Sequence, residues 1–425
     1  MCRIKVENVF DVFEARGFIE QVTDRQGVRE LLASPTTCYI GFDPTAKSFH
    51  IGSLLPIMSL VHMQSAGHRP IAVIGGGTAL VGDPSGKTET RPIMTREEID
   101  ENGEALKKQL SRFIDFSNAK ALMVNNADWL TGLKYVDFLR DIGRHFSVNR
   151  MLAAESYRAR LETGLSFIEF NYMLLQSYDF WYLFKRYDCR LQMGGNDQWG
   201  NILAGADLIR RLEGETAHAL TSPLLATSSG TKMGKTHKGA IWLDPELTSP
   251  FDYYQYWINQ DDRDVERFLA IFTLLPLDEV RRLGNLKGSS PREAREVLAY
   301  EATKLCHGQR EADLAREASR QLFIRVGESI KVEDSVQVEA YSDATPTFTL
   351  SRGELEQGIP AYILFEKAGL CKSRGEARRL ISQGGGYLNG QGIQAFDQVI
   401  DSKGFRNNSL LLRAGKKRYM RICAG

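Results

Sequence analysis

Cysteine is scarce in this chain, and its spacing excludes two kinds of architecture. Only six of the 425 residues are cysteines: Cys2, Cys38, Cys189, Cys306, Cys371 and Cys423. No two of them have the C-x-x-C spacing of a zinc site or a redox motif. Scattered cysteines are typical of free thiols in a reducing compartment, so the pattern favours the cytoplasm over a disulfide-stabilised secreted protein.

Long apolar runs are also missing. The longest charge-free apolar stretch near the start, residues 70–82, is too short and too rich in glycine to cross a bilayer. The first residues, "MCRIKVENVFDVFEARG", contain acidic side chains and no apolar core, so we expect no targeting segment and no membrane partner. The composition, 43% hydrophobic and 25% charged, indicates a globular protein with room for two or three domains.

The chain has little net charge, +1, but that charge is unevenly distributed. Residues 360–425 contain twelve Lys or Arg and four Asp or Glu, a net charge of +8, which leaves −7 for the rest. A basic end on an acidic body is typical of a nucleic-acid-binding appendage, although chance clustering would give the same numbers.

Strand-like and helix-like segments alternate over the first half of the chain. The strand candidates are residues 37–43, 69–77, 120–126 and 189–195. Helical apolar spacing lies between them, as in residues 52–67, so the pattern predicts an α/β fold with a Rossmann-like, doubly wound parallel sheet. Ligands of such sheets bind beyond the carboxyl ends of the strands, which directs attention to residues 43–52, 75–87 and 194–198.

The rest of the chain divides by composition. We expect a catalytic domain over residues 1–250 and, where helical periodicity meets many charges, a helical domain over 251–326. Residues 327–359 are polar and lack that periodicity, which predicts a linker, and residues 360–425 form a small α+β basic module.

His50 stands directly before an apolar helix in "SFHIGSLLPI" (48–57). A polar side chain at a helix start is common and has no functional meaning by itself. The alternative is an imidazole that binds an anion held against the positive end of the helix. The residues alone leave both interpretations open.

A glycine-rich loop, "GGGTALVGDPSGKTETR" (75–91), contains Lys87 and Arg91. It is not a Walker A loop, because "GDPSGKT" is one residue short of that spacing. The glycines could simply make turns, and Asp83 could bind a substrate amine or cap a turn.

Two further segments concentrate polar side chains. In "LQMGGNDQWGN" (191–201) they surround two glycines, where a polar cluster is costly if buried and idle, although a surface turn is the alternative. In "NYMLLQSYD", Tyr172, Gln176 and Asp179 share one helical face among apolar neighbours, which suits a pocket for a small polar molecule. Finally, "GTKMGKTHKG" (230–239) carries Lys232 and Lys235; such loops are usually solvated, but lysines also bind phosphate well.

Taken together, these segments resemble the bacterial-type tyrosyl-tRNA synthetases, a family of class I aminoacyl-tRNA synthetases. "FDPTAKSFHIGS" resembles the family's HIGH region and "KMGKT" its KMSKS loop, while "GDPSGK", "NYMLLQSYD", "GGNDQWGN" and "KSRGEARRLISQGGGYLNG" complete the similarity. The ordered set covers nearly the whole chain and is far more specific than any one string.

The resemblance implies ligation of L-tyrosine to tRNA(Tyr) through tyrosyl-adenylate, with ATP as a substrate, Mg²⁺ accompanying the ATP, and no resident metal. Thr45 and His50 would hold the phosphates during in-line attack by the tyrosine carboxylate. The groups that would close on the leaving pyrophosphate are Lys232, Lys235, Lys87 and Arg91.

The resemblance also implies how the substrates are read. Tyr39 and Asp179 would bind the phenol hydroxyl, and Asp83, Tyr172 and Gln176 the ammonium group. The ATP and adenylate would be lined by Gly41, Asp43, His50, Ser53, Gln192, Gly194, Asp197, Gln198 and Lys235.

In the basic module the resemblance is to an RNA-binding fold shared with a small-subunit ribosomal protein. Lys372, Arg374, Arg378 and Arg379 would lie on one short helix; a solvated basic face is the alternative. The last strand would carry Lys416, Lys417, Arg418 and Arg421. The family also implies a homodimer.

Two positions depart from the family motifs, and two rival functions follow. Ser53 replaces the second histidine of the HIGH motif, and Gly234 replaces the middle serine of the KMSKS loop, which removes a donor and adds flexibility. One rival is a tryptophanyl-type or other class I ligase, against which the pair Tyr39 and Asp179 argues. The other is an RNA-binding protein that has lost ligase activity, against which the intact His50 and lysines argue.

Overall fold

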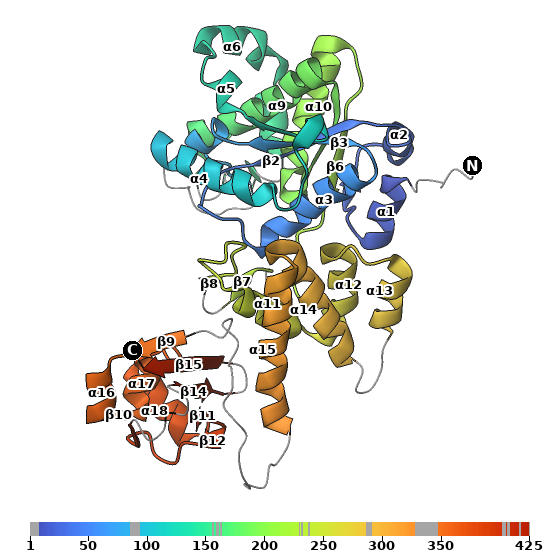
Figure 1. Ribbon diagram of the computed structural model, residues 1–425. Coiled ribbons are helices and arrows are strands. Elements are labelled where there is room, and N and C mark those ends of the chain that lie inside the picture. The colour runs from blue at the N-terminus through green and yellow to red at the C-terminus, as the bar shows by residue number, and fades with distance from the viewer. Residues whose placement is uncertain are drawn as a thin grey trace. The chain divides into compact units, whose positions relative to one another are not determined.

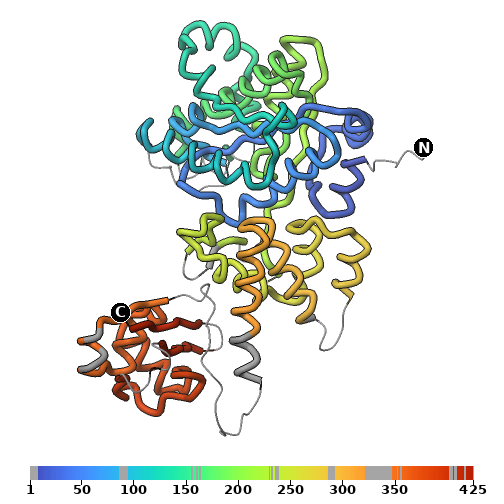
Figure 2. Tube along the Cα trace, viewed as in Figure 1, coloured from blue at the N-terminus to red at the C-terminus, as the bar shows by residue number. Residues whose placement is uncertain are grey.

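The computed structural model describes residues 8–85, 94–154, 157–158, 161, 164–228, 230, 233–236, 239–285, 291–327, 347–401, 405, 409–415 and 418–424. The chain forms two units, which Figure 2 lets the reader follow from the blue N-terminus to the red C-terminus. The first comprises residues 1–244 and 260–298, and the second comprises residues 245–259 and 299–425.

A six-stranded sheet organises the first unit (Figure 1). Its strands are β1 (Gln21–Val22), β2 (Thr37–Phe42), β3 (Arg69–Ile74), β4 (Leu122–Asn125), β5 (Cys189–Gly195) and β6 (His218–Ser222). They lie in the order β1-β6-β5-β2-β3-β4, and every neighbouring pair is parallel except β1 with β6. The predicted doubly wound parallel sheet is therefore confirmed, and its strand order reverses between β2 and β5.

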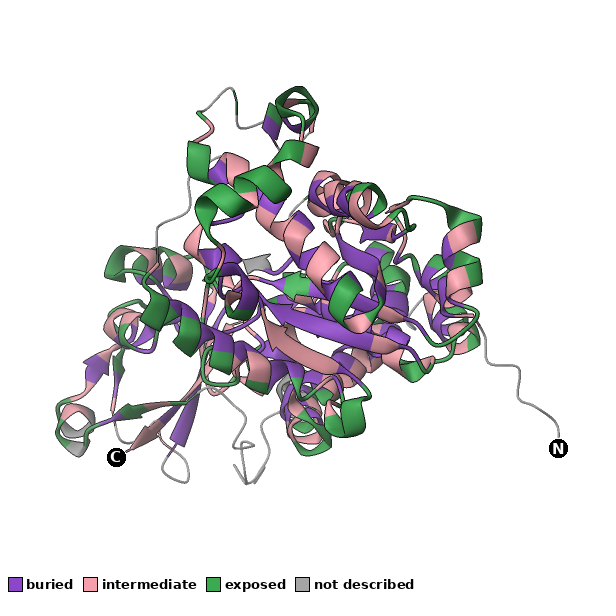
Figure 3. Cartoon of the chain, turned by 90° about the horizontal axis from the view of Figure 1, so that it is seen from above, coloured by how far each residue is buried: buried purple, intermediate pink, exposed green. Residues whose placement is uncertain are grey.

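The central strands are covered on both faces, as their continuous apolar sequences predict. Five of the six residues of β3 are buried, and Figure 3 shows the inner strands as largely buried ribbons. Helices α9 (Phe167–Tyr187) and α10 (Trp199–Glu213) pack on one face, where Phe180 contacts the ring of Tyr39 at 5.4 Å. Helix α3 (Leu54–Ser65) packs on the other face (Figure 1). Each large apolar side chain buried in this way contributes about 1.5–3 kcal/mol.

Local sequence signals set the helix boundaries. Helix α9 begins with a capping box in which Ser166 and Glu169 satisfy each other's backbone N–H groups, and it ends at Asp188 in a left-handed conformation. The other helices of the first unit are α1 (Val9–Arg16), α2 (Arg25–Leu31), α4 (Arg96–Leu110), α5 (Ala127–Leu130), α6 (Tyr135–Asp141), α7 (Val148–Ala153), α12 (Asp262–Phe272) and α13 (Leu277–Gly284). None of the helices in the described part of the chain combines the length and hydrophobicity that a membrane span requires.

The helices expected over residues 251–326 are present, but the two units share them. Helices α12 and α13 belong to the first unit, because α12 packs against α1 and α3. Helices α11 (Pro250–Ile258) and α15 (Gln309–Gly327) belong to the second unit and pack on each other, and α14 (Pro291–His307) continues from one unit into the other. The division of residues 1–326 into a catalytic and a helical domain stays a prediction.

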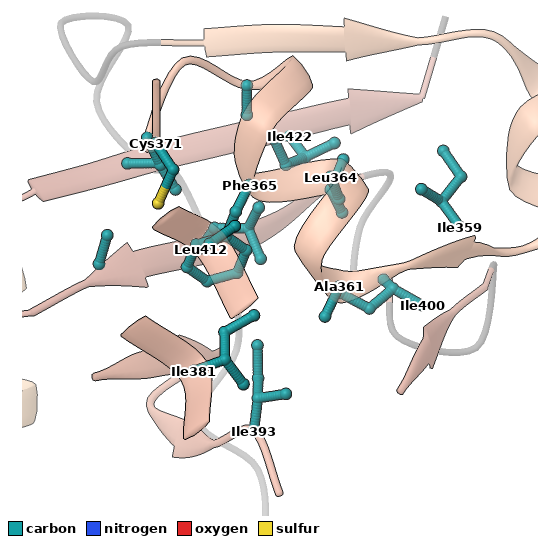
Figure 4. Close-up of a cluster of buried hydrophobic side chains, with 14 of the residues drawn as sticks. Ile359, Ala361, Leu364, Phe365, Cys371, Ile381, Ile393, Ile400, Leu412 and Ile422 are labelled. Atoms are coloured by element: carbon teal, nitrogen blue, oxygen red, sulfur yellow. The ribbon is translucent and has the colours of Figure 1, made fainter. Parts of the chain in front are cut away.

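A five-stranded sheet with its own core ends the chain. It consists of β9 (Thr347–Leu350), β11 (Gly386–Leu388), β12 (Gln391–Gly392), β14 (Ser409–Ala414) and β15 (Arg418–Ala424), in the order β12-β11-β14-β15-β9. Helices α17 (Ala361–Lys367) and α18 (Arg374–Ser382) supply Phe365 and Ile381 to a core with Leu412 and Ile422 (Figure 4). The α+β architecture expected for the module is therefore present.

The range predicted as a linker, 327–359, needs a correction at its end, over residues 347–359, whereas residues 328–346 lie outside the described residues. Strand β9 pairs in parallel with β15, and α16 (Arg352–Gln357) follows it with a capping box between Ser351 and Glu354. Leu350 is buried in the module's core. The segment looks like a linker in the sequence because a four-residue edge strand buries only one of its side chains and so has no apolar periodicity.

Candidate active site

A cavity of about 520 Å³ opens at the carboxyl ends of β2 and β5, where the strand order reverses. The predicted site residues in its lining are Tyr39, Gly41, Asp43, Thr45, His50, Ser53, Asp83, Tyr172, Gln176, Asp179, Gln192, Gly194, Asp197 and Gln198. These side chains come from segments more than 150 residues apart in the sequence. The topology therefore brings together the polar groups that sequence analysis placed in separate loops.

Most of the predicted basic partners have no described position. Lys87, Arg91 and Lys232 lie outside the described residues, as do Lys416 and Lys417 in the basic module. Lys235 is described only by its backbone, which forms β7 (Lys235–Thr236) and pairs with β8 (Gly239–Ala240).

Asp179 is a buried carboxylate in the lining of the cavity. It is 4% exposed, and its two carboxylate oxygens accept hydrogen bonds from Trp129 Nε1 at 2.7 Å and Asn126 Nδ2 at 2.9 Å. Burial raises the pKa of Asp179 to about 7, against the lowering effect of these two bonds.

Tyr39 lines the same end of the cavity and is 2% exposed. Burial, and then the charge of Asp179, raise the pKa of Tyr39, so its phenol stays protonated at neutral pH. Its hydroxyl has no hydrogen-bond partner among the described residues. A buried donor without a partner costs about 1–3 kcal/mol, so this end of the cavity suits a ligand that supplies an oxygen.

A chain of hydrogen bonds connects Asp179 to the middle of the cavity. Asn126 Nδ2 donates to Thr78 Oγ1 at 3.0 Å, and Thr78 Oγ1 donates to Asp43 Oδ1 at 2.8 Å. The other oxygen of Asp43 accepts from Tyr172 Oη at 2.9 Å. These contacts fix the orientation of side chains from three strand ends and one helix.

Asp83 forms a second buried carboxylate. Its Oδ1 accepts from the backbone N–H of Ser85 at 2.9 Å and its Oδ2 from Gln198 Nε2 at 2.7 Å. Burial, followed by the charge of Asp43, raises the pKa of Asp83 to about 6, against the hydrogen bonds from Ser85 and Gln198. Of the two interpretations left open for Asp83, the turn cap is present in the structure, and the residue also faces the cavity.

The polar loop after β5 is not simply a surface turn. Gln192 is 2% exposed, and its Oε1 has no hydrogen-bond partner in the part of the chain that the structure describes. Buried Asn201 lies at hydrogen-bond distance from both Gln176 Oε1, 3.0 Å, and Gln198 Oε1, 3.2 Å. These contacts hold the two glutamines toward the cavity.

His50 lies where sequence analysis expected it, at the start of a helical turn (Ile51–Ser53) that leads into α3. Its Nδ1 accepts the backbone N–H of Gly52 at 2.9 Å, so it caps that turn and lines the cavity at the same time. Trp242 pairs with His50 as an antiparallel bridge, and their rings are 6.2 Å apart.

Gly234 is explained differently from the sequence-based interpretation. Its φ is +81°, a conformation that side chains rarely adopt, and a Cβ atom there would lie 3.1 Å from the backbone nitrogen of Gly52. The glycine therefore allows close approach to the segment that carries His50. Added flexibility is not needed to account for it.

Sequence analysis missed four residues that organise the cavity: Asn126, Trp129, Asn201 and Trp242. Asn126 directly follows β4, so the rule that polar residues after parallel strands face the ligand would have found it. Trp129 and Trp242 give no such signal, and Asn201, although it ends the polar segment 191–201, contacts Gln176 only because the fold brings the two together.

The basic residues of the C-terminal module surround the start of α18. Arg374, Arg378 and Arg379 lie on that helix and are exposed, whereas Lys372 precedes its Ser373 cap, which corrects the prediction that all four share the helix. Arg374 pairs with Glu366 at 2.9 Å. The Arg378 guanidinium lies 4.2 Å from the ring centre of Tyr362.

The predicted strand residues are partly confirmed in position. Arg418 and Arg421 lie on β15, which begins at Arg418. Arg418 Nη1 donates to the carbonyl of Leu370 at 2.6 Å and lies 3.5 Å from Glu376. Arg418 therefore ties β15 to the segment before α18.

Comparison with known proteins covers both units. The family described as tRNA synthetases class I (W and Y) matches residues 32–324, and the tyrosine–tRNA ligase SYY-like C-terminal domain matches residues 337–422. The tyrosine–tRNA ligase of Syntrophus aciditrophicus (strain SB) is 56% identical over 98% of this chain and 99% of its own length. That of Desulfatibacillum aliphaticivorans is 55% identical over 98% of each chain.

A solved structure shows the same relationship. The C-terminally truncated mitochondrial tyrosyl-tRNA synthetase of Aspergillus nidulans superposes with a TM-score of 0.67 and 32% identity. The match covers 75% of this chain and 94% of that one. The chain therefore belongs to the class I tRNA synthetases, within the tyrosine–tRNA ligase family.

Proposed function

We propose that this chain performs the reaction of its relatives, the ligation of tyrosine to tRNA, with the cavity as its active site. In the first step the tyrosine carboxylate attacks the α-phosphorus of ATP, and pyrophosphate leaves. In the second step a ribose hydroxyl of the terminal adenosine of tRNA attacks the acyl carbon of tyrosyl-adenylate, and AMP leaves. Positioning and charge stabilisation account for catalysis of this kind.

The assignment of tyrosine as the substrate rests on the buried hydroxyl of Tyr39, which lies beside Asp179. Within the described part of the chain this hydroxyl has no hydrogen-bond partner. In our proposal the phenol of the substrate donates to Asp179 and accepts from Tyr39. Asn126 and Trp129 fix the orientation of the Asp179 carboxylate, because each of them donates a hydrogen bond to one of its two oxygens. Phenylalanine would leave the Tyr39 hydroxyl without a partner and would remove the hydrogen bond that the substrate phenol donates to Asp179, which disfavours phenylalanine.

The ammonium group is assigned to Asp83, Tyr172 and Gln176. Asp83 supplies the negative charge, and Gln198 and Asn201 hold the neighbouring groups in place. This arrangement places the two ends of tyrosine at the two buried carboxylates, Asp179 and Asp83. The adenylate is then expected along the rest of the lining, from Gly41 and Asp43 to Gln192, Gly194, Asp197 and Gln198.

We assign the phosphates to the segment around His50. Because Nδ1 of His50 accepts from Gly52, a phosphate would be bound through the other ring nitrogen. Thr45 and Ser53 line the cavity on either side of His50 in the sequence. Lys232, Lys235, Lys87 and Arg91 are proposed to stabilise the leaving pyrophosphate, as lysine and arginine do at phosphates.

Mg²⁺ is proposed to arrive with ATP. Within the described residues, no group of three His, Cys, Asp or Glu side chains is placed to hold a metal ion. Mg²⁺ usually keeps several waters and is held through phosphates and few carboxylates, so a dedicated protein cage is not needed.

The C-terminal module is proposed to bind the tRNA. Lys372, Arg378 and Arg379 are exposed there, and the sequence from residue 360 onward carries a net charge of +8. Exposed cations of this kind bind a polyanion through its phosphates, which gives affinity without sequence specificity. The cytoplasm remains the proposed location, on the cysteine pattern described above.

A homodimer is also proposed. Tyr135 and Val136 on α6, Val148 on α7 and Phe167 at the start of α9 are all more than half exposed. These helices pack on one another through a shared apolar cluster, so the exposed side chains lie on neighbouring elements. A second copy of the chain would cover them. Light scattering should give twice the monomer mass, and Phe167→Asp should halve it.

One experiment tests the proposed reaction and separates it from its rivals. Pyrophosphate exchange into ATP is measured with each of the twenty amino acids in turn. Exchange with tyrosine alone supports the proposal, and exchange with tryptophan would favour the other class I ligase. No exchange with any amino acid, together with tight tRNA binding, would favour an RNA-binding protein without ligase activity.

A further inference from the structure

The segment that leads into the lysine loop (residues 230–239) is attached to a helix from a distant part of the chain. The backbone N–H of Ser228 donates to Asp264 Oδ2 at 2.8 Å, and Arg267 Nη2 donates to the carbonyl of Ala226 at 2.5 Å. Asp264 and Arg267 both lie on α12 and pair with each other at 2.9 Å. Two side chains one turn apart on α12 therefore hold alternate backbone groups of residues 226–228.

This contact differs from the surface ion pairs of the molecule. Asp264 is 3% exposed, whereas the nearby pair of Arg263 with Asp261 is exposed on both sides. A buried carboxylate needs partners that replace its hydration, and here they are Arg267 and a backbone N–H of another segment. The arrangement gives a directional attachment between α12 and the start of the loop.

Helix α12 is itself fixed at its opposite end. Arg16, 7% exposed at the end of α1, donates to the carbonyls of Ala270, Thr273 and Leu275. These carbonyls lie at the C-terminus of α12, where helical backbone acceptors otherwise lack partners. The helix is thereby held at both ends, by α1 and by the segment before the loop.

The far end of the loop is attached to the segment that carries His50. The backbone N–H of Ile51 donates to the carbonyl of Ile241 at 3.0 Å, and that of Leu243 donates to Phe49 at 2.8 Å. One end of the loop is thus held beside the cavity, and the other end is held by α12. The backbone beside Lys235 is tied to both ends, because Met233 N–H donates to the carbonyl of Leu225 at 3.0 Å and Ile241 N–H donates to that of Gly234 at 3.0 Å.

We propose that Asp264 and Arg267 are positioning residues for tyrosyl-adenylate formation, because they fix the start of the loop that carries Lys235. They touch neither substrate and act through the backbone of residues 226–228. The inference rests on the proposed role of Lys235 at the pyrophosphate. Displacement of a catalytic group by about 1 Å is enough to slow a reaction by as much as 100-fold.

The test compares variants in the full-length chain by single-turnover adenylate formation, with rates expressed per active site after titration. Arg267→Gln is the first variant, because this side chain is nearly half exposed and glutamine keeps an amide donor beside Asp264. Asp264→Asn is the second. We expect adenylate formation per active site to slow about 10-fold or more with the tyrosine Kd little changed, and the melting temperature measures the accompanying loss of stability separately.

The control is Arg263→Gln, which removes another Asp–Arg pair at the same end of α12, one whose hydrogen bonds join Arg263 to Asp261. Its rate should match that of the unaltered chain. Equal slowing in the control, or normal rates for both Arg267→Gln and Asp264→Asn, would overturn the proposal.

A double-mutant cycle with Lys235→Ala distinguishes positioning from a general structural effect. If α12 acts through Lys235, Arg267→Gln should slow the Lys235→Ala enzyme much less than it slows the unaltered one. Undiminished slowing in that background overturns the inference and leaves the proposed function intact. A Lys235→Ala enzyme with a normal rate would instead refute the proposed role of the loop.

Discussion

In the cavity of the first unit, Asp83 and Asp179 are each less than a tenth exposed, and each carboxylate accepts two hydrogen bonds. In the C-terminal module, Lys372, Arg378 and Arg379 are exposed, and Arg378 lies over an aromatic ring. Buried charges with fixed partners can read the shape of a small molecule, whereas exposed charges on long side chains adapt to a polyanion. The two regions should therefore respond differently to substitution, salt and pH.

The largest effect is expected in the first region, from His50→Ala. The imidazole is proposed to bind phosphate mainly in the transition state, so adenylate formation should slow by about 10²–10³-fold while the tyrosine Kd stays nearly constant. Stopped-flow rates and equilibrium dialysis measure the two quantities. His145→Ala, at a histidine that does not line the cavity, is the control. A large loss of tyrosine affinity at an unchanged rate would remove His50 from this role.

Removal of residues 328–425 should affect tRNA binding but not the activation of tyrosine. Pyrophosphate exchange should stay close to the full-length rate, because the cavity lies wholly within the first unit. Affinity for tRNA should fall by roughly 100-fold, and its log–log salt dependence should flatten by about 0.7–0.9 for each lost phosphate contact. Filter binding over a salt series measures both. An unchanged salt slope would show that the module does not bind the tRNA.

Acidic pH should lower kcat/KM for tyrosine but should leave the affinity for tRNA unchanged. The raised pKa of Asp83, about 6, means that this carboxylate gains a proton as pH falls through that value and loses its attraction for the ammonium group. Asp179, whose pKa is raised to about 7, also gains a proton as the pH falls and then no longer accepts the phenol as a carboxylate. Because both carboxylates are needed in ionised form, we expect kcat/KM for tyrosine to fall about tenfold per pH unit between about pH 7 and about pH 6, and about a hundredfold per pH unit below about pH 6.

The same pH series with tRNA is the control. Residues 360–425 contain no histidine, the side chain that ordinarily titrates between about pH 5 and about pH 8, so tRNA affinity should be flat across that range. A flat profile for tyrosine would contradict the assignment of Asp83 to the ammonium group.

The smallest effect is expected from Tyr39→Phe, which keeps the shape of the pocket and removes one hydroxyl. Discrimination against phenylalanine should fall by about 1 kcal/mol, the value of one neutral hydrogen bond. The ratio of kcat/KM for tyrosine to that for phenylalanine measures it. Tyr157→Phe, at a buried hydroxyl that bonds the backbone outside the cavity, is the matched control. An unchanged ratio for Tyr39→Phe would show that Tyr39 does not contact the phenol.

Much of the fold follows from local pattern, and the failures have physical causes. Continuous apolar runs predict β2, β3 and β5 because these strands are covered on both faces, and a similar run predicts β4, although its four residues are only half-buried at the edge of the sheet. Strands β1 and β9 escape prediction because they are edge strands of two and four residues, with few buried side chains. Helix α12 falls within the range expected for a separate helical domain, and only its tertiary contacts with α1, α3 and residues 226–228 reveal that it belongs to the first unit.

Much of the cavity lining can be predicted from the sequence, because helix periodicity and the ends of parallel strands determine which polar residues lie together. Tyr172, Gln176 and Asp179 share a helical face, while Gln192 and Gly194 lie at the end of a parallel strand that Asp197 and Gln198 follow, so geometry alone brings them together. The contacts that hold these groups are not predictable. Trp129 reaches Asp179 from a distant segment, and Asn201, although it ends the polar segment 191–201, meets Gln176 only because of the fold.

The two anchors of Asp179 bear on how the amino-acid preference of this enzyme could evolve. Replacement of Asp179 alone by an apolar residue would leave the indole N–H of Trp129 without its acceptor and would remove one of the two acceptors of the Asn126 amide, which still donates to Thr78. A buried donor without an acceptor costs about 1–3 kcal/mol, so such a substitution would lower stability as well as change the preference. An apolar pocket at this point therefore favours accompanying substitutions at Trp129 or Asn126.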